Sequence, residues 1–252
     1  MSTKIKLQKA IKHKVGSKST ASQTLPPDSA LTNSFLHKTV HAAGHDLRSP
    51  LFIIRSYSQL LQRTQEKNML KNGFQLMNEA TVKMEKTINE FVGLIDIYTL
   101  PFPEKTNVSF EAAFETVQFE LVSLLNQYQP TLSCDFDSFP TTLFNEKYLI
   151  DILTYLLDNA IRHNTDRQDL EIKVFSKKIN DQLVLVVEDN GQGIEDDPEK
   201  VSNPFYTYTK EEQPECVGMG LAKVQAIAQV SQGSFSLEST AGMTRAIFVF
   251  NG

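Results

Sequence analysis

Four short motifs in this chain carry side chains and backbone groups that could do chemistry. The first places His45 directly before the carboxylate of Asp46, a pairing in which an imidazole can act as a nucleophile or a base. Apolar residues surround this pair with helical spacing, and His45 lies off their face, so we expect it to point toward solvent. A single histidine is more often structural or merely solvated, so this motif alone assigns no function.

The second motif runs from Leu156 to His163 and places Asn159 in a largely apolar helix. A buried amide that finds no partner costs about 1–3 kcal/mol. Its oxygen is also a suitable ligand for Mg²⁺, and Arg162 and His163 follow one turn later, where they can face the same anion. A helix asparagine bonded to a nearby backbone group remains an equal alternative.

The third and fourth motifs are rich in glycine. An expected strand ends at Asp189, and Gly191 and Gly193 follow; a carboxylate there can accept a hydrogen bond from a ligand amino group. Gly218 and Gly220 precede an expected helix, whose first N–H groups can hold a phosphate. Each pattern is weak alone, because Asn-Gly is also a common hairpin turn.

Two expected helices position His45. Apolar residues recur at steps of three and four over residues 31–61 and again over 70–95, with a polar break at 64–68. We expect Pro50 to bend the first helix and the prolines at 101 and 103 to end the second. The expected apolar seam of the second helix consists of Leu70, Phe74, Met77, Ala80, Met84, Ile88, Phe91 and Ile95. Because a lone hairpin leaves such a stripe uncovered, a homodimer forming a four-helix bundle is the economical prediction.

The second half of the chain mixes helices and strands. Helices are expected at 110–128, 146–162 and within 217–230, and strands at 131–136, 170–175, 183–188, 234–237 and 246–250. This order favours an α+β or α/β sandwich with the helices on one face of the sheet. We therefore divide the chain into a basic tail (1–30), a helical domain (31–100) and a mixed domain (106–252).

Composition is that of a soluble globular protein. The 252 residues are 40% hydrophobic and 22% charged, which is enough for two domains with real cores. No apolar run is long enough to cross a bilayer and no signal peptide is expected, so we expect a cytoplasmic protein. The two cysteines fit a reducing compartment, and the net charge of -5 argues against a general nucleic-acid binder.

The tail is the basic part of the chain. Six lysines precede the first acidic residue, Asp28. Such a segment is either a disordered, solvated tail or a short amphipathic helix that docks on a partner or an anionic membrane surface. The sequence leaves both possibilities open.

Taken together and in this order, the four motifs resemble those of sensor histidine kinases. Asn203-Pro204-Phe205 is similar to that family's F box, which precedes a flexible lid. The second half thus resembles the family's ATP-binding domain, of the Bergerat-type nucleotide fold. The first half resembles its dimerisation and phosphoacceptor domain, a helical hairpin that pairs into a four-helix bundle.

The resemblance implies an ATP-dependent autokinase. His45 would receive the γ-phosphoryl group of ATP and pass it to an aspartate of a separate response regulator. Asp46 would orient or deprotonate the imidazole, although adjacent helical residues do not normally face each other. Ser49, which shares a helix face with His45, keeps a hydroxyl that would allow the reverse, phosphatase reaction. An upstream sensor partner would have to deliver the signal.

The resemblance also implies a nucleotide site for ATP and Mg²⁺. Asn159 would hold the metal, Asp189 would bind the adenine amino group, and Lys210 in the lid would reach the γ-phosphate. The complete set implied is Asn159, Arg162, His163, Asp189, Gly191, Gly193, Phe205, Lys210, Gly218, Gly220 and Leu221.

Three residues depart from the family pattern. Tyr155 stands where the family has a further asparagine, and Ala222 and Lys223 replace a Gly-Leu pair. Tyr155 cannot activate water as the glutamate of gyrase- and heat-shock-type ATPases does, so ATP hydrolysis is not expected as the main activity. We expect Lys223 to lie in solvent or, alternatively, to contact phosphate. A non-catalytic phosphotransfer or scaffold dimer with a decayed nucleotide site is the second hypothesis.

Overall fold

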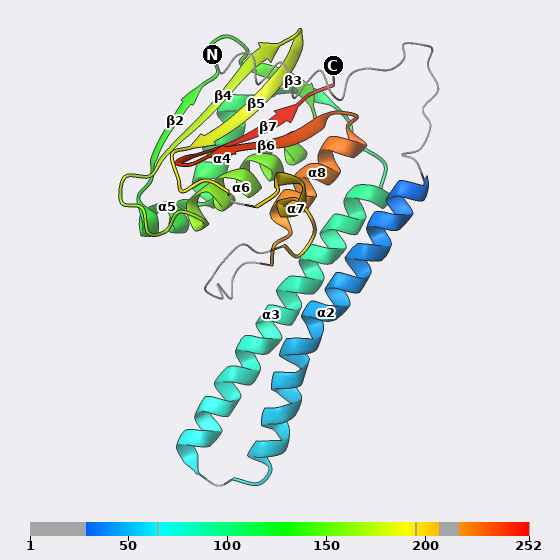
Figure 1. Cartoon of the computed structure of the whole chain (residues 1–252), viewed down its shortest axis with the longest axis vertical. Helices are drawn as coiled ribbons and strands as arrows, with labels where there is room; N and C mark the ends of the chain where they lie inside the picture. Colours follow the sequence, from blue (N-terminus) through cyan, green and yellow to red (C-terminus); the bar gives the residue numbers. More distant parts are fainter. Residues whose placement is uncertain (1–28, 65, 195, 207–216, 252) are drawn as a thin grey trace.

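The computed structural model describes residues 29–64, 66–194, 196–206 and 217–251 (Figure 1). Residues 1–28 of the expected tail and the expected lid residue Lys210 lie outside these ranges, whereas residues 29 and 30 already belong to the first helix.

A helical hairpin forms the first part of the described chain. Helices α2 (Ser29–Leu61) and α3 (Lys67–Thr99) lie antiparallel and side by side, and the end with the connecting turn extends well beyond the second domain (Figure 1). The helix α2 continues through Pro50. As expected, α3 ends just before the prolines at 101 and 103. Within the described residues, no helix is both long and apolar enough to cross a membrane.

The buried seam of α3 differs from the expected one. Gly73, Ala80, Thr87 and Leu94 are buried at intervals of seven residues. In contrast, Phe74 is 61% exposed and Ile88 is 44% exposed, so these two members of the expected stripe do not face α2 and remain uncovered in the single chain. The helix carries two adjacent apolar stripes, and a periodicity of three and four cannot tell which of them faces α2.

The second domain is an α/β sandwich built on a mixed sheet. Within the described residues, the sheet has the strand order β2-β4-β5-β7-β6, in which β2 and β4 are parallel and the other pairs antiparallel. Its strands are β2 (Thr131–Asp135), β4 (Glu171–Ile179), β5 (Gln182–Asp189), β6 (Ser234–Thr240) and β7 (Met243–Val249). The remaining strands, β1 (Thr106–Ser109) and β3 (Thr141–Phe144), pair with each other.

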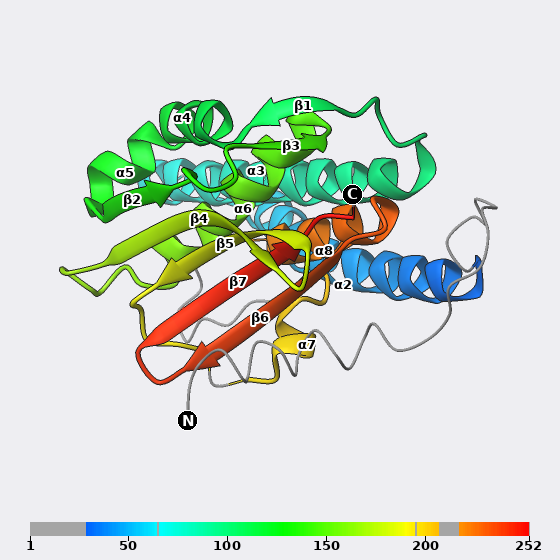
Figure 2. The ribbon, with the colours of Figure 1, turned by 90° about the horizontal axis from the view of Figure 1, so that it is seen from above.

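Helices cover one face of this sheet, as the sequence predicts. They are α4 (Phe110–Glu120), α5 (Val122–Tyr128), α6 (Glu146–Arg162) and α8 (Gly220–Val230), with the short α7 (Pro198–Val201) beside them (Figure 2). The expected helix 110–128 is split at Leu121, which separates α4 from α5. The bounds of α6 agree with the prediction, because Asn145 caps it by accepting a hydrogen bond from the Tyr148 amide.

The core lies between these helices and the sheet. The α6 side chains Ile152, Leu153 and Leu157 are essentially inaccessible to solvent and belong to the same cluster as Val187 of β5. Helix α8 packs on α6 on one side and on α3 of the hairpin on the other (Figure 1). The second domain is therefore in direct contact with the hairpin that carries His45.

Candidate active site

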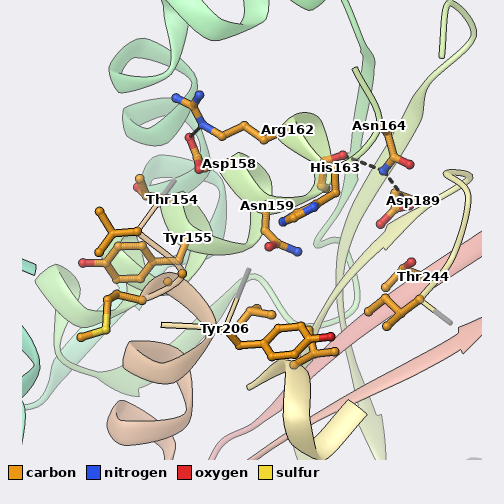
Figure 3. Close-up of a pocket in the computed structure, with 18 of the residues that line it drawn as sticks. Thr154, Tyr155, Asp158, Asn159, Arg162, His163, Asn164, Asp189, Tyr206 and Thr244 are labelled. Atoms are coloured by element: carbon orange, nitrogen blue, oxygen red, sulfur yellow. Dashed lines mark hydrogen bonds and ion pairs between the residues drawn. The ribbon is translucent and has the colours of Figure 1, made fainter. Parts of the chain in front are cut away.

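A cavity of about 270 Å³ lies between α6, the end of β5 and the start of α8 (Figure 3). Residues expected from the sequence to bind nucleotide line much of it: Asn159, Arg162, His163, Asp189, Gly193, Gly218, Gly220 and Leu221. Lys86 and Glu90 of α3 also line it, so the hairpin supplies part of one wall. The structure therefore brings residues of three of the four motifs to one hollow.

Asp189 is the buried carboxylate of this cavity. It is only 6% exposed, and its Oδ1 accepts hydrogen bonds from the Gly191 amide at 2.9 Å and from Asn164 Nδ2 at 3.3 Å. Burial raises the pKa of Asp189 to about 6, while the two hydrogen bonds act in the opposite direction by stabilising the ionised form. At neutral pH the cavity thus holds a carboxylate that is ready to accept a hydrogen bond.

Asn164 is a site residue that the sequence analysis missed. Its Nδ2 donates to the Ala160 carbonyl at 2.8 Å as well as to Asp189, and its Oδ1 accepts from the Gln192 amide at 2.9 Å. A Cβ on Gly191 would lie 2.0 Å from Asn164 Oδ1, so the glycine is needed because the amide packs against it. Gly191 is therefore not among the residues that line the cavity, but it allows Asn164 to pack beside it. The sequence contained one signal that could have identified Asn164 as a site residue: it is a polar residue directly after an apolar helix.

The start of α8 forms a second side of the cavity. Gly218 has a φ of 71°, and a Cβ there would lie 2.4 Å from the Tyr206 carbonyl oxygen. A side chain is therefore excluded both by the backbone conformation and by the neighbouring backbone. Gly220 begins the helix, and its first amides face the cavity side where Gly218, Gly220 and Leu221 lie.

Asn159, Arg162 and His163 occupy different parts of the cavity. The Asn159 side chain points into it (Figure 3). Arg162 Nε donates to Asp158 Oδ1 at 2.8 Å, and this pair lies away from Asp189 (Figure 3). Burial lowers the pKa of His163, only partly offset by Asp158, so at neutral pH its imidazole is an uncharged hydrogen-bonding group.

In the segment before the expected lid, Tyr206 lines the cavity, whereas the expected residue Phe205 does not. Phe205 has a φ of 63°, its amide donates to the Gly218 carbonyl at 2.9 Å, and its ring packs on the core. Tyr206 lines the cavity, and its hydroxyl donates to Asp196. Within the described residues, no cluster of three His, Cys, Asp or Glu could hold a metal by itself, so a cation here would need ligands from a bound molecule as well as Asn159.

Lys223 does not lie in solvent, so that expectation was wrong. Its side chain is 7% exposed, and Nζ lies 2.7 Å from Glu90 Oε2 and 3.2 Å from the Tyr155 hydroxyl. Two of the three residues that depart from the family pattern, Tyr155 and Lys223, are thus in contact with each other and with the hairpin.

His45 lies on the hairpin, outside the lining of the cavity. Its side chain is 76% exposed, as expected, and its Nδ1 lies 3.3 Å from Asp46 Oδ1. The neighbouring carboxylate therefore does reach the imidazole, even though both residues are adjacent on α2. Ser49, one turn later, is exposed.

Known proteins match the second domain and, at low identity, most of the chain. Residues 144–251 match the family of histidine kinase-, DNA gyrase B- and HSP90-like ATPases. Over 215 residues the chain is 27% identical to the methanogenesis regulatory histidine kinase FilI of Methanothrix harundinacea, covering 83% of this chain and 24% of that protein. The chain is related to the sensor histidine kinases.

A second relative agrees with this assignment. The signal transduction histidine-protein kinase ArlS of Staphylococcus aureus is 27% identical over 216 residues, which cover 79% of this chain and 45% of ArlS. The chain therefore spans less than half the length of these curated relatives.

Solved structures share the fold. The Acinetobacter baumannii histidine kinase AdeS superposes with a TM-score of 0.62 at 19% identity, covering 82% of this chain and 97% of that one. The histidine kinase ThkA, solved in complex with the response regulator protein TrrA, gives a TM-score of 0.69 at 17% identity, covering 88% of this chain and 64% of ThkA. The mixed α/β sandwich with a preceding hairpin is thus the histidine kinase fold.

Proposed function

We propose that this chain is an ATP-dependent protein histidine kinase that phosphorylates its own His45. The observation that carries the proposal is the cavity itself, in which the buried Asp189 carboxylate and the start of α8 line one hollow. One end is suited to a flat amine-bearing ring and the other to phosphate, and an exposed imidazole lies on the adjoining domain.

The adenine end is built around Asp189. Its ionised carboxylate accepts a hydrogen bond from the exocyclic amino group, while Asn164 and Gly191 hold the carboxylate in place through Oδ1. A charged acceptor that is fixed in a buried site discriminates strongly against rings that lack the amino group.

The phosphate end is the start of α8. Its first backbone amides and the helix dipole favour an anion, and the glycines at 218 and 220 keep side chains out of the way. Asn159, which points into the cavity, is the residue that would hold Mg²⁺ together with the phosphates. The metal supplies charge neutralisation when bound.

The acceptor chemistry belongs to His45 and Asp46. An N–H on Nδ1 donates to Asp46 Oδ1, which leaves the lone pair of Nε2 exposed for attack. Nε2 forms a bond to the γ-phosphorus while the bond to the β,γ-bridging oxygen breaks, and ADP leaves. Because His45 lies outside the cavity lining, the two domains must move relative to each other before transfer.

The hairpin would dimerise through its uncovered apolar side chains. Those that remain exposed on α2 and α3 are Val40, Leu51, Phe52, Leu60, Phe74, Leu76, Val82, Ile88 and Val92. Nonpolar side chains in such number on two adjacent helices favour burial against a second copy, which gives a four-helix bundle.

The phosphoryl group would then pass to a response regulator aspartate. ThkA is described in complex with a response regulator, which supports a partner of this class for the related chain. Arg48 and Tyr57, on the same helix as His45, would form part of the docking face for this partner, and Ser49 would orient water in a reverse reaction. A cytoplasmic location and a separate upstream sensor complete the proposal.

The proposal is tested by incubating the purified chain with γ-labelled ATP and Mg²⁺. Acid-labile label that disappears in His45→Gln is the expected result. If the chain shows neither label nor nucleotide binding, the result would instead favour the second hypothesis, a phosphotransfer scaffold with a decayed nucleotide site.

A further inference from the structure

Three residues from three helices meet at the contact between the two domains. Lys223 of α8 forms an ion pair with Glu90 of α3, with 2.7 Å between Nζ and Oε2. The same ammonium donates to the Tyr155 hydroxyl of α6 at 3.2 Å and lies 5.2 Å from the centre of the Tyr155 ring. The partners come from the hairpin on one side and from the nucleotide-binding domain on the other.

The contact stabilises the charge on Lys223. Burial alone would lower the pKa of the ammonium, but Tyr155 and Glu90 outweigh that effect and raise it. A buried charge that loses its partner is strongly destabilised. Of the two partners of Lys223, Glu90 is the one that belongs to the other domain. Removing the Glu90 carboxylate while the domains stay in contact would therefore leave the Lys223 ammonium buried and unpaired, which destabilises the contact.

The surroundings accommodate the ion pair. A Cβ on Gly93, one turn after Glu90, would lie 3.2 Å from Lys223 Nζ, so the glycine leaves room for the ammonium. Further along the same two helices, the Tyr98 hydroxyl donates to Gln229 Oε1 at 2.8 Å. The contact is thus a built interface along α3 and α8.

The contact also closes the nucleotide cavity. Tyr155 and Glu90 both line it, so residues of the ion-pair contact form part of the cavity wall. His45 lies outside that wall. Delivery of a bound phosphoryl group to His45 consequently requires the hairpin and the nucleotide-binding domain to part at this place.

We propose that Glu90, Lys223 and Tyr155 form an interdomain latch that holds the nucleotide-binding domain against α3 in the resting state. Breaking the latch is the step that frees this domain to move toward the phosphoacceptor. The latch limits the rate of that movement and leaves the chemistry of transfer to other residues.

Amide hydrogen exchange of the full chain tests the latch without relying on kinase activity. In Glu90→Gln, exchange should become roughly three- to tenfold faster in residues 86–98 and 220–230, whereas the strands β5 and β7 should be unchanged. Lys223→Met keeps the packing of the aliphatic part of the lysine side chain and should have the same effect on exchange. The double variant with Glu90→Gln and Lys223→Met should exchange no faster than either single variant. Glu85→Gln, an exposed glutamate on the same helix, is the matched control and should behave as the unmodified chain.

Exchange that is equal in Glu90→Gln and Glu85→Gln would overturn the latch. If the chain is a kinase, the initial rate of labelling from γ-labelled ATP should rise several-fold in Glu90→Gln, and a fall would also overturn the proposal. Absence of label in every variant would refute the kinase function while the exchange measurement still decides the latch.

Discussion

The Nδ1 atom of His45 lies 3.3 Å from Oδ1 of Asp46, although the two residues are neighbours on one helix. Side chains at adjacent helical positions usually diverge, so this contact requires the carboxylate to turn back toward the ring. In the tautomer that carries its proton on Nδ1, this contact is a hydrogen bond to Asp46, and Nε2 is left to react.

Replacing Asp46 with asparagine should therefore slow phosphorylation of His45 by at least about tenfold, because an amide fixes the imidazole tautomer less well and cannot accept a full proton. ATP affinity should not change, since Asp46 is remote from the cavity. Initial rates at saturating nucleotide, together with equilibrium binding, check both statements. A loss of ATP affinity with an unchanged rate would contradict this role.

The pKa of Asp189, raised to about 6 by burial, predicts how nucleotide binding depends on pH. Only the ionised carboxylate accepts the adenine amino hydrogen, so ATP affinity should fall as the pH drops below about 6, approaching tenfold per pH unit. The stability of the nucleotide-free protein should show the opposite trend. Between about pH 4 and 6, Asp189 is protonated in the native state but ionised in the unfolded state. The free energy of unfolding therefore decreases as the pH rises through that window. Calorimetric titrations from pH 5 to 7.5 measure the affinity. Asp189→Asn should bind weakly and independently of pH, and a pH-dependent Asp189→Asn variant would contradict the assignment.

Asn164 should matter for nucleotide binding although it acts through Asp189. Asn164→Ala removes a hydrogen bond to a charged group, which is worth about 1.5–3 kcal/mol, so ATP affinity should fall by roughly tenfold or more. The midpoint of the pH dependence should also move upward, because one of the two groups that stabilise the ionised carboxylate is gone. Asn107→Ala, an exposed asparagine on β1, is the matched control. If Asn164→Ala lowers ATP affinity without shifting the midpoint of the pH dependence, Asn164 does not act through the Asp189 carboxylate.

The exposed apolar side chains of the hairpin predict a dimer. Phe52 is 71% exposed, and Phe52→Glu should convert the dimer to a monomer by placing a charge in the apolar interface. Phe119, which is 81% exposed on α4, serves as control, and Phe119→Glu should remain dimeric. Sedimentation velocity distinguishes the two forms. A monomeric unmodified chain would refute the four-helix bundle.

Sequence reasoning located the elements with strong local signals. The apolar periodicity of residues 146–162 located α6, and the carboxylate at the end of β5 and the glycines before α8 marked the cavity. It missed what depends on contacts between distant segments. Asn164 matters through Asp189 on another element, Lys223 is buried only because Glu90 of the hairpin meets it, and β1 and β3 are four-residue strands that pair across more than thirty residues.

The central claim is that the nucleotide cavity exists to phosphorylate a single imidazole. It is tested most directly by incubating the full chain with γ-labelled ATP and Mg²⁺ and mapping the labelled residue by mass spectrometry under alkaline conditions, which preserve phosphohistidine. The expected result is label on His45 that is labile to acid and absent from His45→Gln, while ATP binding by that variant is unchanged. Binding of ATP without label on His45, under every divalent metal tried, would contradict it.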